Sequence, residues 1–180
     1  MTVTISSNFD SGNIEVLGIE GDTATLAIRK DHASDFYQWF HFQVTGAAGR
    51  PLTLRIVNAA TSAYPLGWSG YAARYNDSGG DAEWLQTATD YVDGVLTIRH
   101  RPHGDTTCFA YHAPYSSRRH ADLIARTAAV TGVDHRVLGT TLDGRPLDAL
   151  TIGQGPRHVW LYARQHPGET MAQWWAEGAL

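Results

Sequence analysis

Two residues near the end of this 180-residue chain have the types and the spacing of metal ligands. His166 and Glu169 lie three positions apart, on either side of Pro167 and Gly168. Imidazole nitrogens and carboxylate oxygens are common ligands of divalent metals. A His-x-x-Glu spacing alone also arises by chance on surface loops, and these residue types would suit several metals. The pair is therefore a candidate metal site, and the strength of the evidence for it depends on the elements predicted around it.

The segment before the pair predicts a buried strand over residues 157–163. Apolar side chains occupy both alternating faces of this segment, which is typical of a central strand in a parallel or mixed sheet; they are Val159, Leu161 and Ala163 on one face and Trp160 and Tyr162 on the other. Because Pro167 disfavours helical angles in the residue before it, we expect His166 to stay extended and continue the strand.

The segment after the pair predicts a helix over residues 170–180. Gly168 allows the chain to turn sharply, and Glu169 then falls in the first helical turn, where exposed amides favour a carboxylate. A strand-end imidazole and a helix-start carboxylate would converge outside the sheet edge. Open α/β sheets place their ligand sites at such an edge.

The stretch Ala163-Arg-Gln-His-Pro-Gly-Glu169 resembles the first zinc-binding segment of the M14-type metallocarboxypeptidases. It is most similar to the cytosolic carboxypeptidase branch, whose segment reads A-R-x-H-P-G-E. Three earlier stretches also resemble that branch's N-terminal domain, so the resemblance extends along nearly the whole chain; they are Phe9–Asn13, Trp39–Phe42 and Cys108–Ser116.

The resemblance implies that His166 and Glu169 bind Zn²⁺ and that a second histidine beyond Leu180 completes the ligand set. It implies hydrolysis of a C-terminal peptide or isopeptide bond by a zinc-activated water. The general-base glutamate and the arginine that binds the substrate carboxylate also lie beyond Leu180 in the family, so we expect no catalytic residue within this chain. The wider family often has an arginine where Gly168 stands. Arg164 is a candidate substrate-binding residue, with a surface or salt-bridge role as the alternative.

Residues 1–115 predict an antiparallel β-sandwich, because short strands alternate with turn signals. Asn76–Gly80 is expected to be a loop. The many aromatic residues are expected to pack in the core, although a binding platform for sugars or peptide rings is an alternative. The expected strands are Ile14–Ile19, Thr23–Ile28, Trp39–Val44, Leu52–Val57, Val95–His100 and Thr106–Tyr111.

Residues 116–180 predict the incomplete beginning of an α/β carboxypeptidase domain with a mixed sheet. Ser116 is a natural N-cap for a helix that runs toward Val130. Strands over 136–141 and 146–152 form a hairpin, since Asp143-Gly144 marks a tight turn. One helix before and one helix after a three-stranded sheet cannot cover both faces of that sheet. We therefore expect more of the domain in the same polypeptide or a companion chain.

The composition narrows the function classes. A formal net charge of −4 gives no electrostatic reason to expect nucleic acid or an anionic membrane as a partner. The N-terminus lacks a basic patch followed by an apolar run, and Cys108 is the single cysteine, so a cytoplasmic location is expected. The other eight histidines are scattered singly and are taken as structural.

Three functions remain open from the sequence. The first is the N-terminal portion of a zinc metallocarboxypeptidase that acts on peptide or protein C-termini and is inactive as this chain alone, because two ligands leave a catalytic zinc site incomplete. The second is a non-catalytic β-sandwich binding module, for carbohydrate or protein, with a vestigial α/β tail. The third is a fragment whose helix over 170–180 docks onto a separate chain that supplies the missing ligands.

Overall fold

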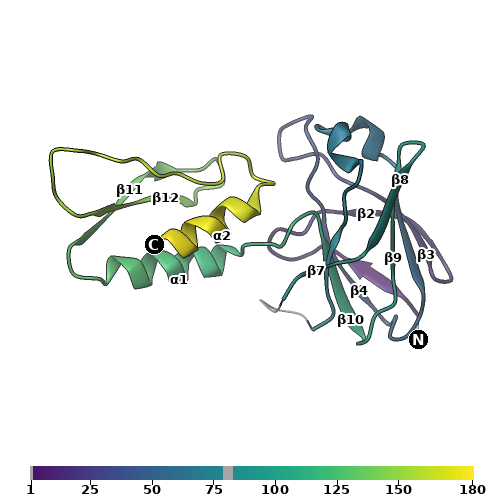
Figure 1. The fold of residues 1–180 in the computed structure, drawn as a ribbon. Coiled ribbons are helices and arrows are strands. Elements are labelled where there is room, and N and C mark those ends of the chain that lie inside the picture. Colours follow the sequence, from purple (N-terminus) through teal and green to yellow (C-terminus); the bar gives the residue numbers. More distant parts are fainter. Residues whose placement is uncertain (1, 79–82) are drawn as a thin grey trace. The chain divides into compact units, whose positions relative to one another are not determined.

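The computed structural model describes residues 2–78 and 83–180, so the last two residues of the expected loop Asn76–Gly80 lie outside the described part. The chain forms two compact units, Met1–Pro114 and Tyr115–Leu180 (Figure 1). Within the described residues, every helix is too short or too polar to cross a bilayer.

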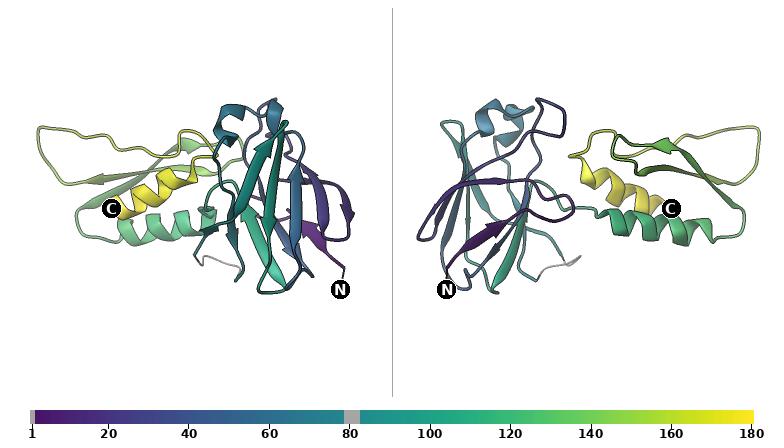
Figure 2. Two further views of the ribbon diagram at one scale, coloured as in Figure 1. Left: turned by 45° about the vertical axis from the view of Figure 1, so that its right-hand side comes forward. Right: turned by 180° about the vertical axis from the view of Figure 1, so that it is seen from behind.

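The first unit contains two five-stranded sheets (Figure 2). The first sheet is antiparallel throughout and has the order β1 (Thr4–Ser6), β4 (His41–Thr45), β10 (Thr106–Ala110), β6 (Arg74–Asn76), β7 (Leu85–Gln86). The second has the order β2 (Glu15–Glu20), β3 (Thr23–Ala27), β5 (Leu52–Ile56), β9 (Val95–His100), β8 (Ala88–Val92). Two short 3₁₀ helices, η1 (Ala59–Thr61) and η2 (Pro65–Trp68), follow β5.

Buried side chains from both sheets form one core. Alternate residues of the central strands are fully buried, including Phe42 on β4, Leu54 on β5 and Ile98 on β9. Each such side chain contributes about 1.5–3 kcal/mol by leaving water. Trp68 is also core, since its ring is buried and its indole N–H donates to the Ala59 carbonyl over 3.0 Å. The expectation of aromatic packing is therefore correct for these rings, whereas Tyr64 is exposed.

The prediction that every strand pair in this unit is antiparallel is wrong for one pair. β3 and β5 run parallel, with Ala24 opposite Leu54, so the second sheet is mixed. The long connection between these strands passes through β4 in the other sheet, and a crossover of this kind returns the chain in the same direction.

The second unit begins with α1 (Ser117–Ala128), and the predicted cap is confirmed because the Ser116 hydroxyl accepts the Arg119 backbone N–H over 3.1 Å. The predicted hairpin is also confirmed: β11 (Val133–Thr140) pairs antiparallel with β12 (Pro146–Ile152). Helix α2 (Thr170–Ala179) ends the chain. The views in Figures 1 and 2 agree that α1 and α2 lie side by side.

The predicted buried strand over 157–163 is not formed. Residues 153–169 join no ladder, and the side chains of Val159 and Trp160 are 83% and 80% exposed. Alternation of apolar residues shows that a segment suits a sheet interior, but a strand also needs a neighbour that accepts and donates its backbone hydrogen bonds. Among the described residues, β11 and β12 pair only with each other.

Candidate metal site

The two predicted ligands are the ends of one tight turn. The Glu169 backbone N–H donates to the His166 carbonyl over 3.0 Å, and Pro167 and Gly168 are the two central residues. A turn closed by such a bond keeps its end Cα atoms within about 7 Å. Both side chains are exposed to solvent. His166 was expected to continue a strand, but it begins this turn instead, since no ladder precedes it.

Glu169 is the residue immediately before helix α2 rather than part of its first turn. It has φ −88° and ψ 58°, and its carboxylate makes no hydrogen bond to the exposed amides of the helix. Those amides form the positive end of the helix dipole, which favours an anionic group nearby. The carboxylate is therefore not used for capping and can serve as a ligand.

Arg164 donates hydrogen bonds to the turn, to α2 and to the start of the second unit. Its Nε donates to the Pro167 carbonyl over 2.9 Å, and its Nη1 donates to the Gln173 side-chain oxygen and, over 3.5 Å, to the Tyr115 carbonyl. Its backbone has φ 58°, in the left-handed region that costs a non-glycine residue about 1–2 kcal/mol. The predicted contact of Arg164 with substrate stays a prediction.

Helix α2, which follows the turn, is fastened to α1 by a charged cluster. The Glu177 carboxylate accepts from Arg119 Nε over 2.7 Å and from Arg126 over 3.2 Å. The hydrogen bond from Arg119 holds the pKa of Glu177 below its usual range. The Arg119 guanidinium also lies 4.2 Å from the centre of the Trp174 ring. This cluster holds the helix that follows Glu169 against α1.

The residues present fit part of a zinc site. A histidine and a carboxylate are typical zinc ligands, and the turn brings them together, but catalytic zinc takes three protein ligands and a water. Within residues 2–78 and 83–180, no group of three His, Cys, Asp or Glu side chains is arranged to hold a metal ion. The described residues therefore offer two side chains of ligand type at this turn, fewer than such a site needs.

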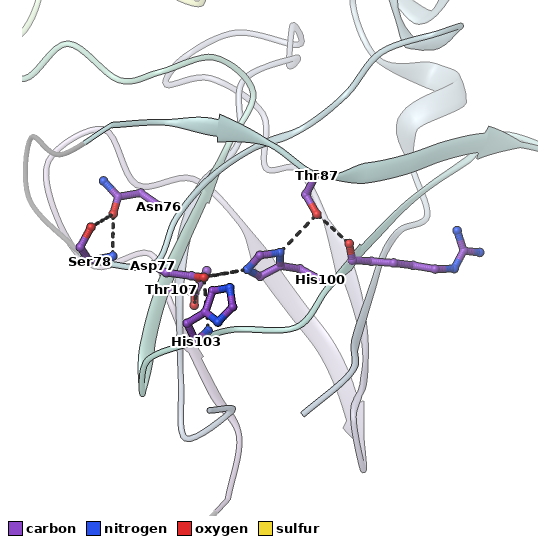
Figure 3. Close-up of polar contacts among 8 residues, drawn as sticks. Asn76, Asp77, Ser78, Thr87, His100, His103 and Thr107 are labelled. Carbon is purple, nitrogen blue, oxygen red and sulfur yellow. Dashed lines mark hydrogen bonds and ion pairs between the residues drawn. The ribbon is translucent and has the colours of Figure 1, made fainter. Parts of the chain in front are cut away.

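Sequence reasoning missed a buried polar cluster in the first unit (Figure 3). The Asp77 carboxylate accepts from Thr107 Oγ1 over 2.6 Å and contacts His100 Nε2 at 3.0 Å. It also accepts the His103 backbone N–H over 3.3 Å. The His100 ring lies between Asp77 and Thr87, whose hydroxyl is 3.3 Å from Nδ1.

The Asp77 cluster is a hydrogen-bonded polar site within the fold. The side chains of Asp77 and His100 are only 14% and 8% exposed. Burial raises the pKa of Asp77, but the hydrogen bonds from Thr107, His100 and the His103 backbone outweigh it, so the pKa of Asp77 is lowered. No local sequence signal joins positions 77, 100 and 107, because strand register alone brings them together.

Three further single histidines also have side-chain partners, as expected for structural residues. His41 Nδ1 lies 2.9 Å from the Ser11 hydroxyl. His120 and His135 contact the two carboxylate oxygens of Asp148 at 3.2 and 2.8 Å. These contacts give the three imidazoles defined places in the two units.

Comparison with known proteins gives matches along the chain. A family model described as the cytosolic carboxypeptidase N-terminal domain matches residues 5–112. An uncharacterized protein of Zymomonas mobilis is 54% identical over all of this chain, which covers 47% of that relative. Mouse cytosolic carboxypeptidase 4 is 28% identical over 97% of this chain, which covers 20% of that protein.

Solved structures match over both units. The crystal structure of a metallo-carboxypeptidase from Burkholderia cenocepacia has a TM-score of 0.94 and 38% identity, covering 99% of this chain and 48% of that one. A metallo-carboxypeptidase from Pseudomonas aeruginosa, solved with (2-guanidinoethylmercapto)succinic acid, has a TM-score of 0.90 and 39% identity, covering 97% and 48%. The chain thus spans about half the length of these relatives.

The fold and these matches define the class as M14-type metallocarboxypeptidases. Within that class, the chain belongs to the cytosolic carboxypeptidase family, through the N-terminal domain that residues 5–112 match. The sequence-based assignment to this family is confirmed.

Proposed function

We propose that this chain is the N-terminal portion of a zinc-dependent metallocarboxypeptidase that hydrolyses C-terminal peptide or isopeptide bonds. Residues 1–115 would form a β-sandwich domain, and residues 116–180 would begin the catalytic domain. The observation that carries the proposal is the hydrogen-bonded turn from His166 to Glu169, because it brings two zinc-ligand types together in a chain of this family. The two sheets with their common core support the sandwich.

His166 and Glu169 are the proposed zinc ligands of this portion. When bound, the zinc would supply a water of lowered pKa and polarise the substrate carbonyl. The third ligand, the general base and the arginine for the substrate carboxylate would come from the rest of the catalytic domain, in the same polypeptide or a companion chain. Residues 1–180 alone would then not be a competent peptidase. We propose a cytoplasmic location from the cytosolic relatives.

We prefer this function to the binding-module alternative because the similarity does not stop at the first unit. The two metallo-carboxypeptidase structures match 99% and 97% of this chain, so the match extends well into the second unit. A vestigial tail would have no reason to keep a tight turn with two ligand-type side chains at its ends.

The test is zinc binding and peptide hydrolysis by the complete gene product. Zinc affinity is measured by chelator competition, and activity by release of the C-terminal amino acid from peptides with a free or an amidated C-terminus. His166→Ala and Glu169→Gln should each weaken zinc binding by more than the roughly 10–100-fold typical of groups around a metal site. His158→Ala, a change of an exposed histidine in the same segment, is the control. Equal zinc affinity in all four proteins would refute the proposal.

A further inference from the structure

The side chain of Arg164 contacts the turn that carries the two proposed ligands. Arg164 lies two residues before His166 and is half-buried, whereas His166 and Glu169 are exposed. Its Nε donates to the carbonyl of Pro167, a central residue of the turn, over 2.9 Å. The same guanidinium donates to Gln173, the fourth residue of α2. One rigid group therefore links the turn to the helix after it.

The guanidinium also reaches the start of the second unit. Its Nη1 is 3.5 Å from the carbonyl of Tyr115, the residue before the Ser116 cap of α1. The Tyr115 ring packs edge-on against Trp174 of α2, with ring centroids 5.1 Å apart. The hydrogen bond from Arg164 therefore reaches a residue that is itself held by α2. Arg164 thus ties the turn to α2 and to the residue that leads into the cap of α1.

The backbone of Arg164 supports this assignment. Its φ of 58° is in a region that glycine adopts freely and arginine does not. A strained conformation of this kind persists only where surrounding contacts over-determine it, and such positions cluster at functional sites. The contacts with Pro167, Gln173 and Tyr115 help to hold Arg164 in place.

We propose that Arg164 is a positioning residue that holds the His166–Glu169 turn in the geometry that binds the metal. This inference rests on the proposed function, because it concerns the same turn. A planar guanidinium can serve the Pro167 carbonyl and the Gln173 oxygen at once, whereas a single ammonium cannot take both positions in the same fixed geometry. The role is therefore specific to arginine.

The decisive variant is Arg164→Gly in the complete gene product, because glycine keeps the positive φ without strain and removes only the side chain. Zinc affinity by chelator competition should weaken about 10–100-fold, as for other groups that orient metal ligands. The melting temperature of the zinc-free protein should be unchanged or higher. Arg164→Lys should lose zinc affinity as Arg164→Gly does. Arg157→Gly makes the same charge change at an exposed position and should bind zinc as the wild type does.

A second measurement needs no metal. Hydrogen exchange of the Glu169 amide, which donates to the His166 carbonyl, should be at least about tenfold faster in zinc-free Arg164→Gly, with exchange in α1 and β11 unchanged. Unchanged Glu169 exchange would overturn the inference even if the zinc site itself proved wrong. Wild-type zinc affinity combined with a raised KM in Arg164→Gly would also overturn it, since Arg164 would then act on the substrate. Loss of zinc binding in His166→Ala but not in Arg164→Gly would refute the positioning role and leave the proposed function intact.

Discussion

Burial of His41 should lower the stability of the first unit in mild acid. His41 lies at the start of β4, is 7% exposed, and has the rings of Phe9, Trp39 and Trp84 around it, with centroids at 4.8, 6.2 and 5.5 Å. This burial lowers the pKa of His41 to about 4, against a smaller opposite effect of the Asp10 carboxylate. The folded protein therefore holds a neutral imidazole where the unfolded chain binds a proton.

The size and direction of the effect follow from the two pKa values. In the unfolded chain His41 titrates near its ordinary value of 6.5, so the shift to about 4 is worth about 3 kcal/mol at about 1.4 kcal/mol per unit. Above pH 6.5 both states are neutral at this position, and His41 adds no pH dependence. As the pH falls from about 6.5 to 4 the unfolded state takes up the proton first, and stability falls progressively by that amount.

The assay is native-state hydrogen exchange of the slowest amides in β4 and β10, because these report the opening of the first unit alone. The free energy of opening is measured from pH 7 to pH 4 in the wild type and in His41→Gln, which cannot titrate there. The difference between the two proteins should change by about 2–3 kcal/mol over this range, in the direction of a weaker wild type. Titratable groups that do not interact with His41 contribute equally to both proteins and cancel.

The control separates burial from the hydrogen bond to Ser11. Ser11 has φ 66°, so Ser11→Gly removes the hydroxyl that lies 2.9 Å from His41 without straining the backbone. The pH dependence should persist in Ser11→Gly, since burial is the main cause of the lowered pKa. A wild-type minus His41→Gln difference that stays constant within about 0.5 kcal/mol between pH 7 and pH 4 would refute the reasoning.

Two further predictions concern the charged clusters. Asp77→Asn should destabilise the first unit by about 1–3 kcal/mol at pH 7, because Thr107 and His100 lose a charged partner. Since the pKa of Asp77 is lowered in the fold, this stabilisation is present above about pH 4 and is lost as the pH falls through the folded pKa. Chemical denaturation of the wild type and Asp77→Asn at pH 7 and pH 3 measures the loss of stability. An equal loss at both pH values would contradict the prediction. Glu177→Gln should speed amide exchange in α2 about tenfold, because Arg119 and Arg126 lose their carboxylate, with β11–β12 exchange as the internal control.

Local signals in the sequence predicted the elements whose contacts are local. β9 has the expected bounds, Val95–His100. Apolar side chains at alternate positions of this strand, Leu96 and Ile98, point into the core, and this alternation is visible in the sequence. One available local signal was missed. Asp93 and Gly94 both have positive φ, 50° and 80°, and they join β8 to β9, so their Asp-Gly sequence marked a hairpin that would have revealed β8.

Non-local pairing could not be predicted in the same way. The apolar alternation of 157–163 describes what the segment suits, but a ladder depends on a partner elsewhere in the chain, and none of the described strands pairs with it. The parallel pairing of β3 with β5 likewise depends on the chain crossing to β4 in the other sheet before it returns to β5. Register between distant strands, not any motif, also assembles Asp77 with His100 and Thr107.

The proposed metal ligands belong to the local class, and this explains why they could be proposed from the sequence. His166 and Glu169 are separated only by Pro167 and Gly168, and one backbone hydrogen bond of 3.0 Å closes the turn that joins them. Steric rules for proline and glycine act over this distance without any tertiary partner. The hydrogen bonds of Arg164 are different, since they involve Gln173 and Tyr115 as well as the turn. Candidate ligands can therefore be proposed from local sequence, whereas the contacts of Arg164 with Gln173 and Tyr115 are visible only in the folded chain.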